Sequence, residues 1–159
     1  MTMDFMADGP WNWCIAGRVG SEPVMAALAG ALERPVHGMV AGADLLCDVY
    51  HVGGDFPTVV DIYLTPAGVT EESIASAVAD RLRAAVLLPD DTLNPSRYVL
   101  CEPDGTVRAV HVDERETDDG VERRHVRPCT GHDPACAAPA GCDRSRWKPD
   151  PTPERPAAA

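Results

Sequence analysis

Three cysteines and a histidine lie close together near the C-terminal end of the sequence. Cys129, His132, Cys136 and Cys142 fall within fourteen positions, in the segment CTGHDPACAAPAGC. Three thiols and one imidazole form a ligand set that a structural zinc ion takes in tetrahedral coordination, and the intervening glycines and prolines let a short backbone turn around one ion. The spacing therefore predicts a zinc site, although it matches no standard zinc module, because paired Cys-x2-Cys knuckles are absent from the sequence.

The same segment permits two other interpretations. Its cysteines could be unpaired thiols on a mobile tail, or they could form a disulfide on exposure to an oxidant. His125 is a further candidate ligand. The remaining cysteines, Cys14, Cys47 and Cys101, fall in apolar, β-rich runs, and we expect them to be buried as small hydrophobic side chains.

Two similar β-rich runs, CDVY and VDIY, alternate acidic with aromatic residues. Strand alternation puts Asp48 and Tyr50 on one face and Asp61 and Tyr63 on one face, and Asp55 lies between the two runs. Carboxylates accept the arginine fork, and tyrosine adds contact area. We therefore expect these five residues to bind a basic protein partner. The alternatives are a solvated outer sheet face, or an acid–base or hard-metal site, for which a nearby His or Glu at motif spacing is missing.

The formal net charge is −11, and most of it lies in residues 44–112, where eleven residues are acidic and four are basic. Such a surface repels phosphate backbones and attracts basic proteins, so direct nucleic-acid binding is disfavoured. No apolar run approaches the roughly 20 residues that span a bilayer, and the N-terminal residues do not resemble a secretory signal peptide. We therefore expect a cytoplasmic protein without membrane contact. The predominance of arginine over lysine and the abundant alanine indicate a high-GC bacterial genome.

Hydrophobic periodicity predicts alternating strands and helices. A first helix is expected at 22–33, with Ser21 as its N-cap and Pro35 after its end. A second has Thr70 as its N-cap and continues to Leu88, where Pro89 ends it. Strands are expected at 11–19, 45–52, 58–65, 97–101 and 107–112, and residues 113–127 are expected to add a further one around 118–120.

The resulting order over residues 11–112 is β-α-β-β-α-β, followed by one or two further strands. This order predicts the α+β class and a ferredoxin-like antiparallel sheet with both helices on one face. We expect a single α+β domain at 1–127, a Cys/His-rich segment at 128–148 that a metal could staple, and a disordered tail at 149–159. Seven of the fifteen prolines lie in the last thirty-two residues, where no packed core can form.

The sequence lacks a nucleophile elbow, a phosphate loop and a Gly-rich dinucleotide turn, which favours a protein without enzymatic activity. We therefore expect an acidic protein-binding module, such as an immunity- or antitoxin-like inhibitor of a basic protein. The first alternative is a zinc-binding accessory protein that acts through its Cys/His tail. The oligomeric state is left open.

A second alternative is a cofactor-free enzyme that acts on a small aromatic substrate. In size and strand order the chain resembles small ferredoxin-like monooxygenases that need no cofactor. The candidate site residues would then be Trp11, Asn12 and Trp13 with His37, His51 and His111. Single histidines on strands are, however, more typical of hydrogen-bonded structural groups. Two tryptophans on one face of a strand are likewise more typical of a core or an interface.

Overall fold

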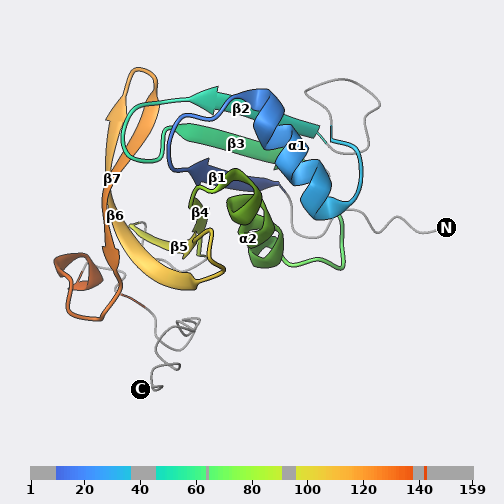
Figure 1. Cartoon of the computed structure of the whole chain (residues 1–159). Helices are drawn as coiled ribbons and strands as arrows, with labels where there is room; N and C mark the ends of the chain where they lie inside the picture. The colour runs from blue at the N-terminus through green and yellow to red at the C-terminus, as the bar shows by residue number, and fades with distance from the viewer. Residues whose placement is uncertain (1–9, 37–45, 64, 91–95, 138–141, 143–159) are drawn as a thin grey trace.

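The computed structural model describes residues 10–36, 46–63, 65–90, 96–137 and 142; the tail expected at 149–159 lies outside them. Two helices cover one face of a single sheet (Figure 1). The elements are β1 Trp11–Ile15, α1 Ser21–Leu32, β2 Leu46–His51, β3 Thr58–Tyr63, α2 Glu71–Leu82, β4 Val86–Pro89, β5 Arg97–Cys101, β6 Val107–Thr117, β7 Gly120–Pro128 and the short 3-10 helix η1 Pro134–Ala137.

The sheet has seven strands in the order β2-β3-β1-β4-β5-β6-β7. Every neighbouring pair is antiparallel. The α+β class is therefore confirmed, and the sheet has more strands than the sequence predicts.

The additional strand is β4, which the sequence assigns to the end of the second helix. That assignment is wrong, because α2 ends at Leu82 and Arg83 takes a left-handed backbone with a φ of 56°. The three residues Val86–Leu88 are buried between β1 and β5. A strand covered on both faces carries no polar alternation, so periodicity cannot distinguish a short apolar run from the last turn of a helix.

The first residues of the two helices are set by their N-cap positions. Thr70 caps α2, as predicted, and its Oγ1 accepts a hydrogen bond from the backbone N–H of Ser73 at 3.2 Å. Ser21 is the first residue of α1 rather than its cap, a position that Gly20 occupies. Neither helix has the length and apolar character needed to cross a bilayer, among the residues that the structure describes.

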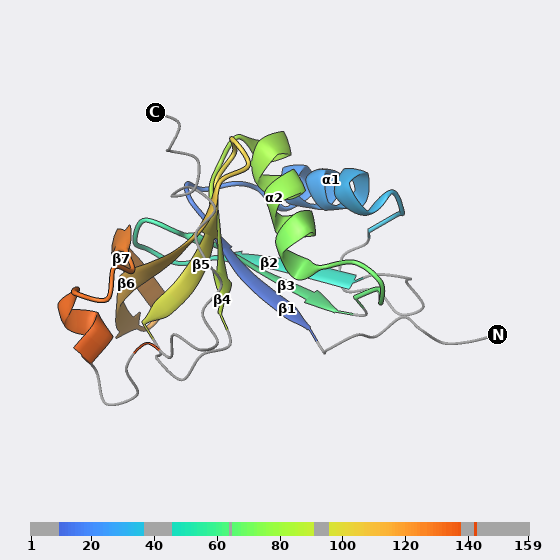
Figure 2. The same cartoon turned by 90° about the horizontal axis from the view of Figure 1, so that it is seen from below.

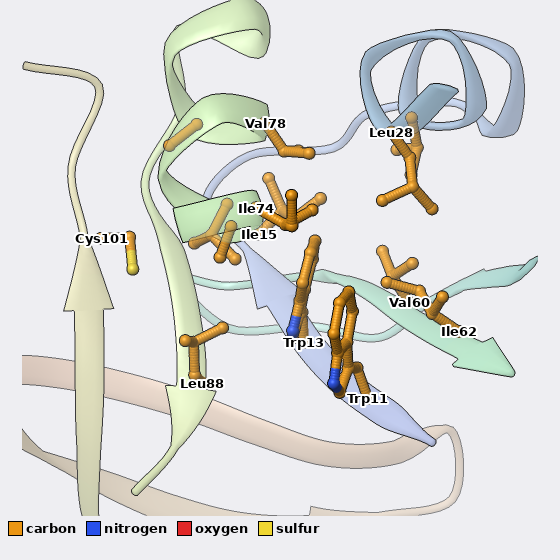
Figure 3. Packing of buried hydrophobic residues seen from close by; sticks show 14 of the residues in the cluster. Trp11, Trp13, Ile15, Leu28, Val60, Ile62, Ile74, Val78, Leu88 and Cys101 are labelled. Atoms are coloured by element: carbon orange, nitrogen blue, oxygen red, sulfur yellow. The ribbon is translucent and has the colours of Figure 1, made fainter. Parts of the chain in front are cut away.

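One hydrophobic core lies between the helices and the sheet. Trp11 and Trp13 point from β1 into it, with their rings stacked at a centroid distance of 5.7 Å (Figure 3). The indole N–H of Trp13 donates to Glu71 Oε2 at the start of α2, at 2.8 Å. The two tryptophans are thus core residues that hold helix to sheet, and both are buried from solvent.

A second core lies on the opposite face of the sheet, around Val59, Leu87 and Val110. The sheet curls so that β5, β6 and β7 turn away from β1–β3 (Figure 2). The loop after β2 then reaches β7, where Gly54 forms an isolated bridge with Arg123. This contact joins the two ends of the sheet and closes the second core on one side.

Residues 113–127, where a further strand is expected, form the second half of β6 and most of β7, which are joined as a hairpin. β6 continues to Thr117, and β7 begins at Gly120. Opposite charges face each other across the two strands, in the pairs Asp113–Arg124, Glu114–Arg123 and Arg115–Glu122. Cross-strand pairs of opposite charge favour this register, so much of the local charge is matched within the hairpin.

Candidate metal centre

Three of the four predicted metal ligands meet in the structure, and a different histidine completes the group. The thiols of Cys129, Cys136 and Cys142 lie beside the imidazole of His111, and one ligand atom from each residue lies within 4.8 Å of the other three. Cys129 directly follows β7, and Cys136 lies in η1, beside the end of β7 in Figure 1. These four residues, called the Cys3His site below, could hold a metal ion.

His132 is not brought to the thiols. It is exposed, and its backbone N–H donates to Thr130 Oγ1. His125 is also exposed, and its Nδ1 lies 3.0 Å from Asp113 Oδ2. His111 takes the place predicted for His132. The reason is the pairing of β6 with β7, in which Val110 lies opposite Pro128, the residue before Cys129.

The distances within the site are those of close, unbonded ligand atoms. His111 Nε2 lies 3.2 Å from Cys136 Sγ and 3.4 Å from Cys142 Sγ. Cys129 Sγ lies 3.9 Å from Cys136 Sγ and 3.6 Å from Cys142 Sγ. A disulfide requires about 2.05 Å, and all six cysteines are free. The arrangement therefore suits one ion among four ligands.

The loop that carries the cysteines is shaped by its own backbone bonds. The N–H of Cys129 donates to the carbonyl of Ala109 at 3.0 Å, which extends the β6–β7 pairing to the first thiol. Asp133 then organises the turn: its carbonyl accepts from the N–H of Cys136 at 2.8 Å, and its carboxylate accepts from the N–H of Ala135 at 2.8 Å. The side chain of Arg127 donates to that carboxylate at 2.5 Å.

His111 is prepared to act as a neutral ligand. Its side chain is completely buried at 0% exposure. Nδ1 lies 3.0 Å from Ser96 Oγ, so Nε2 is the ring nitrogen that faces the sulfurs. Burial lowers the pKa of His111, and the positive charges of Arg127 and Arg97 lower it further, against an opposing effect of Asp133. The free imidazole, rather than imidazolium, is the form that binds metals.

The thiols require a cation to become ligands. Burial, together with the neighbouring thiols of Cys129 and Cys136, raises the pKa of Cys142 to about 12. Three adjacent thiolates repel one another, whereas a bound divalent ion stabilises all three. The other cysteines, Cys14 and Cys47 among them, are buried in the two cores as predicted, and burial raises the pKa of Cys47 to about 12.

The predicted partner-binding residues lie at the other end of the sheet. Asp48 and Asp61 are direct cross-strand partners in β2 and β3. Strand alternation from this pair places Tyr50 and Tyr63 on the same face, away from the helices, and Tyr50 is 42% exposed. Asp55 is exposed in the β2–β3 loop, and its carboxylate accepts from the N–H of His125, so the structure uses it to hold β7.

Comparisons with known proteins provide no assignment. No protein-family model, no curated protein and no solved structure matches the chain.

Proposed function

We propose that this protein binds one structural zinc ion at the Cys3His site, and that the ion clamps the segment after β7 onto β6. The observation that carries the proposal is the convergence of His111 Nε2 with three cysteine sulfurs within 4.8 Å. Four protein ligands leave no open position for a substrate or an activated water molecule, which is the arrangement of structural rather than catalytic zinc.

The measured spacings support a tetrahedral zinc ion. With Zn–S bonds of about 2.3 Å and a Zn–N bond of about 2.0 Å, tetrahedral angles place two sulfurs about 3.8 Å apart and a sulfur and a nitrogen about 3.5 Å apart. Four of the six distances between ligand atoms lie between 3.2 and 3.9 Å, and the other two lie within 4.8 Å. An ion could therefore enter with small shifts of the side chains. We further propose a cytoplasmic location, because a reducing compartment keeps such thiols available.

Metal analysis of matched histidine variants tests the proposal. Protein purified without chelator should contain about one zinc per chain, and His111→Gln should lower that content strongly. His132→Gln should retain it, because His132 is exposed and away from the thiols. Equal zinc content in the two variants, or wild-type protein without zinc after reduction, would contradict the assignment. Substitution by cobalt reports the number of thiolate ligands through its charge-transfer absorption.

We also infer that the first four strands and both helices form a ferredoxin-like unit. The order of those strands across the sheet, β2-β3-β1-β4, supports this interpretation, as do the antiparallel pairs between them. β5, β6 and β7 then extend the unit and carry the zinc site at its far edge.

A second candidate function is the binding of a basic protein through the outer face of β2 and β3. Asp48 stands directly opposite Asp61, and like charges in that position destabilise a sheet. Asn12 Nδ2 donates to Asp61, which offsets part of this cost. A basic partner would offset the remainder, and an immunity- or antitoxin-like inhibitor is the form that this function would take.

Matched charge reversals test the second candidate. Asp48→Lys with Asp61→Lys should abolish binding to a basic partner captured from the native host. Asp118→Lys with Asp119→Lys changes the charge equally at the exposed tip of the β6–β7 hairpin and should have a small effect. Because exposed charges are screened by salt, association should also slow as ionic strength rises. Equal losses in both double variants would contradict the proposed surface.

A further inference from the structure

A buried ion pair lies immediately outside the Cys3His site. Arg97 Nη1 donates to Asp90 Oδ2, and the two side chains are only 2% and 4% exposed. Arg97 Nε donates to Cys129 Sγ at 3.3 Å. A carboxylate, a guanidinium and a metal-ligand sulfur thus form one connected chain, inside the protein and away from the β2–β3 face.

Strand register explains why Arg97 reaches this position. Arg97 in β5 is the direct cross-strand partner of His111 in β6, and Arg127 in β7 is the partner of His111 on its other side. A row of arginine, histidine and arginine therefore crosses three neighbouring strands. The positive charge of Arg127 is directed to Asp133 and Asp113, whereas Arg97 contacts a ligand sulfur directly.

The net charge of the proposed site explains why the contact between Arg97 and Cys129 would stabilise it. One divalent zinc ion, three thiolates and a neutral imidazole sum to a net charge of −1, and a buried net charge is costly unless it is hydrogen-bonded and balanced. A guanidinium N–H directed at a thiolate supplies both a hydrogen bond and a balancing positive charge. Hydrogen bonds between charged groups are stronger than those between neutral groups. Asp90 holds the fork of Arg97 in the orientation that leaves Nε directed at Cys129.

We propose that Arg97, oriented by Asp90, is a positioning residue that stabilises Cys129 as a zinc-bound thiolate and sets the affinity of the site. This inference rests on the proposed zinc function. Outer partners of metal ligands typically change metal affinity by about 10–100-fold when they are removed. Lysine is a poor substitute, because a single ammonium cannot contact Asp90 and Cys129 with the geometry of a planar fork.

Zinc affinity measured by competition with a chromophoric chelator tests the proposal. Arg97→Met should raise the zinc dissociation constant about 10–100-fold, and Arg97→Lys should recover only part of the loss. Arg124→Met is the matched control, since Arg124 lies in β7, on the β6–β7 hairpin that carries His111, and its guanidinium contacts Glu122. Its zinc affinity should equal that of the wild type.

The double variant Arg97→Met with Asp90→Asn separates the N–H···S contact from the effect of a buried carboxylate that has lost the charge of Arg97. If the contact sets the affinity, this double variant should bind zinc as weakly as Arg97→Met alone. Recovery of wild-type affinity in the double variant would overturn the proposal. The comparison also remains informative if Arg97→Met folds poorly, because the double variant removes both charges of the buried pair.

Cobalt-loaded proteins provide a readout that a purely structural role would not change. At saturating cobalt, loss of the N–H···S bond should move the thiolate-to-cobalt charge-transfer band to longer wavelength in Arg97→Met, because the sulfur becomes a stronger electron donor. An unmoved band with unchanged affinity would refute the role of Arg97. Wild-type protein that binds neither zinc nor cobalt would instead refute the zinc function itself, so the two failures are distinguishable.

Discussion

Replacing Gly54 with alanine tests whether the curled sheet is closed by the contact between the β2–β3 loop and β7. Gly54 has a φ of 90°, and a Cβ built there would lie 2.9 Å from both the backbone nitrogen and the backbone oxygen of Arg123. A separation below about 3.0 Å forces the neighbour to move, and here that neighbour is strand backbone. The substitution must therefore separate the loop from β7.

Two contributions determine how much unfolding free energy Gly54→Ala should lose. The left-handed backbone costs a non-glycine residue about 1–2 kcal/mol. Displacement of the loop also threatens the hydrogen bond from Asp55 N–H to the carbonyl of Arg123, at 2.8 Å, and the one from His125 N–H to Asp55 Oδ2, at 3.2 Å. Each such bond contributes about 0.5–1.5 kcal/mol. We expect Gly54→Ala to lower the free energy of unfolding by about 2–5 kcal/mol.

Gly68 provides the matched control. Its φ of 89° is nearly the same, but a Cβ there would meet nothing within 4 Å. Gly68→Ala should therefore lose only the backbone contribution of about 1–2 kcal/mol. Urea unfolding at equilibrium measures both variants on one scale. Equal losses for Gly54→Ala and Gly68→Ala would show that the close approach to β7 contributes nothing, and the closure described above would be refuted.

Three further predictions concern the core, the ionisation of a tyrosine and the metal. Leu28→Ala should lower the free energy of unfolding in urea by about 2–5 kcal/mol, because Leu28 is fully buried. Leu82→Ala should lower it less, since Leu82 is only partly buried. Equal losses in the two variants would contradict this packing. Burial, with a hydrogen bond to Glu114, raises the pKa of Tyr98 to about 12, so between pH 10 and 12 the unfolded chain loses a proton that the folded chain keeps. Stability should fall across that range more steeply in the wild type than in Tyr98→Phe, as measured by unfolding at each pH. Free zinc at 100 times its dissociation constant should stabilise the wild type by about 2.7 kcal/mol, and His111→Gln should show no such difference between zinc and chelator in thermal unfolding.

Local patterns in the sequence determined the elements whose signals are short-range. The alternation around Trp11 and Trp13 predicts a strand with both tryptophans on one face, and the cap at Thr70 predicts the start of α2; both are present. Side-chain periodicity and capping depend on a few neighbouring residues, so they can be seen without knowledge of the fold. The three cysteines of the Cys3His site could also be grouped without knowledge of the fold, because they lie within fourteen positions of the sequence.

Only the tertiary structure decided the rest. Val86–Leu88 form a strand because both faces of the sheet are covered there, and no local signal separates that run from a helix end. His111 joins the thiols because β6 pairs with β7, which brings a buried residue of one strand beside the loop that follows the next. Arg97 reaches Cys129 through the same register. Strand pairing joins residues distant in sequence, so the fourth residue of the Cys3His site and the contact of Arg97 with Cys129 were set by the order of strands in the sheet.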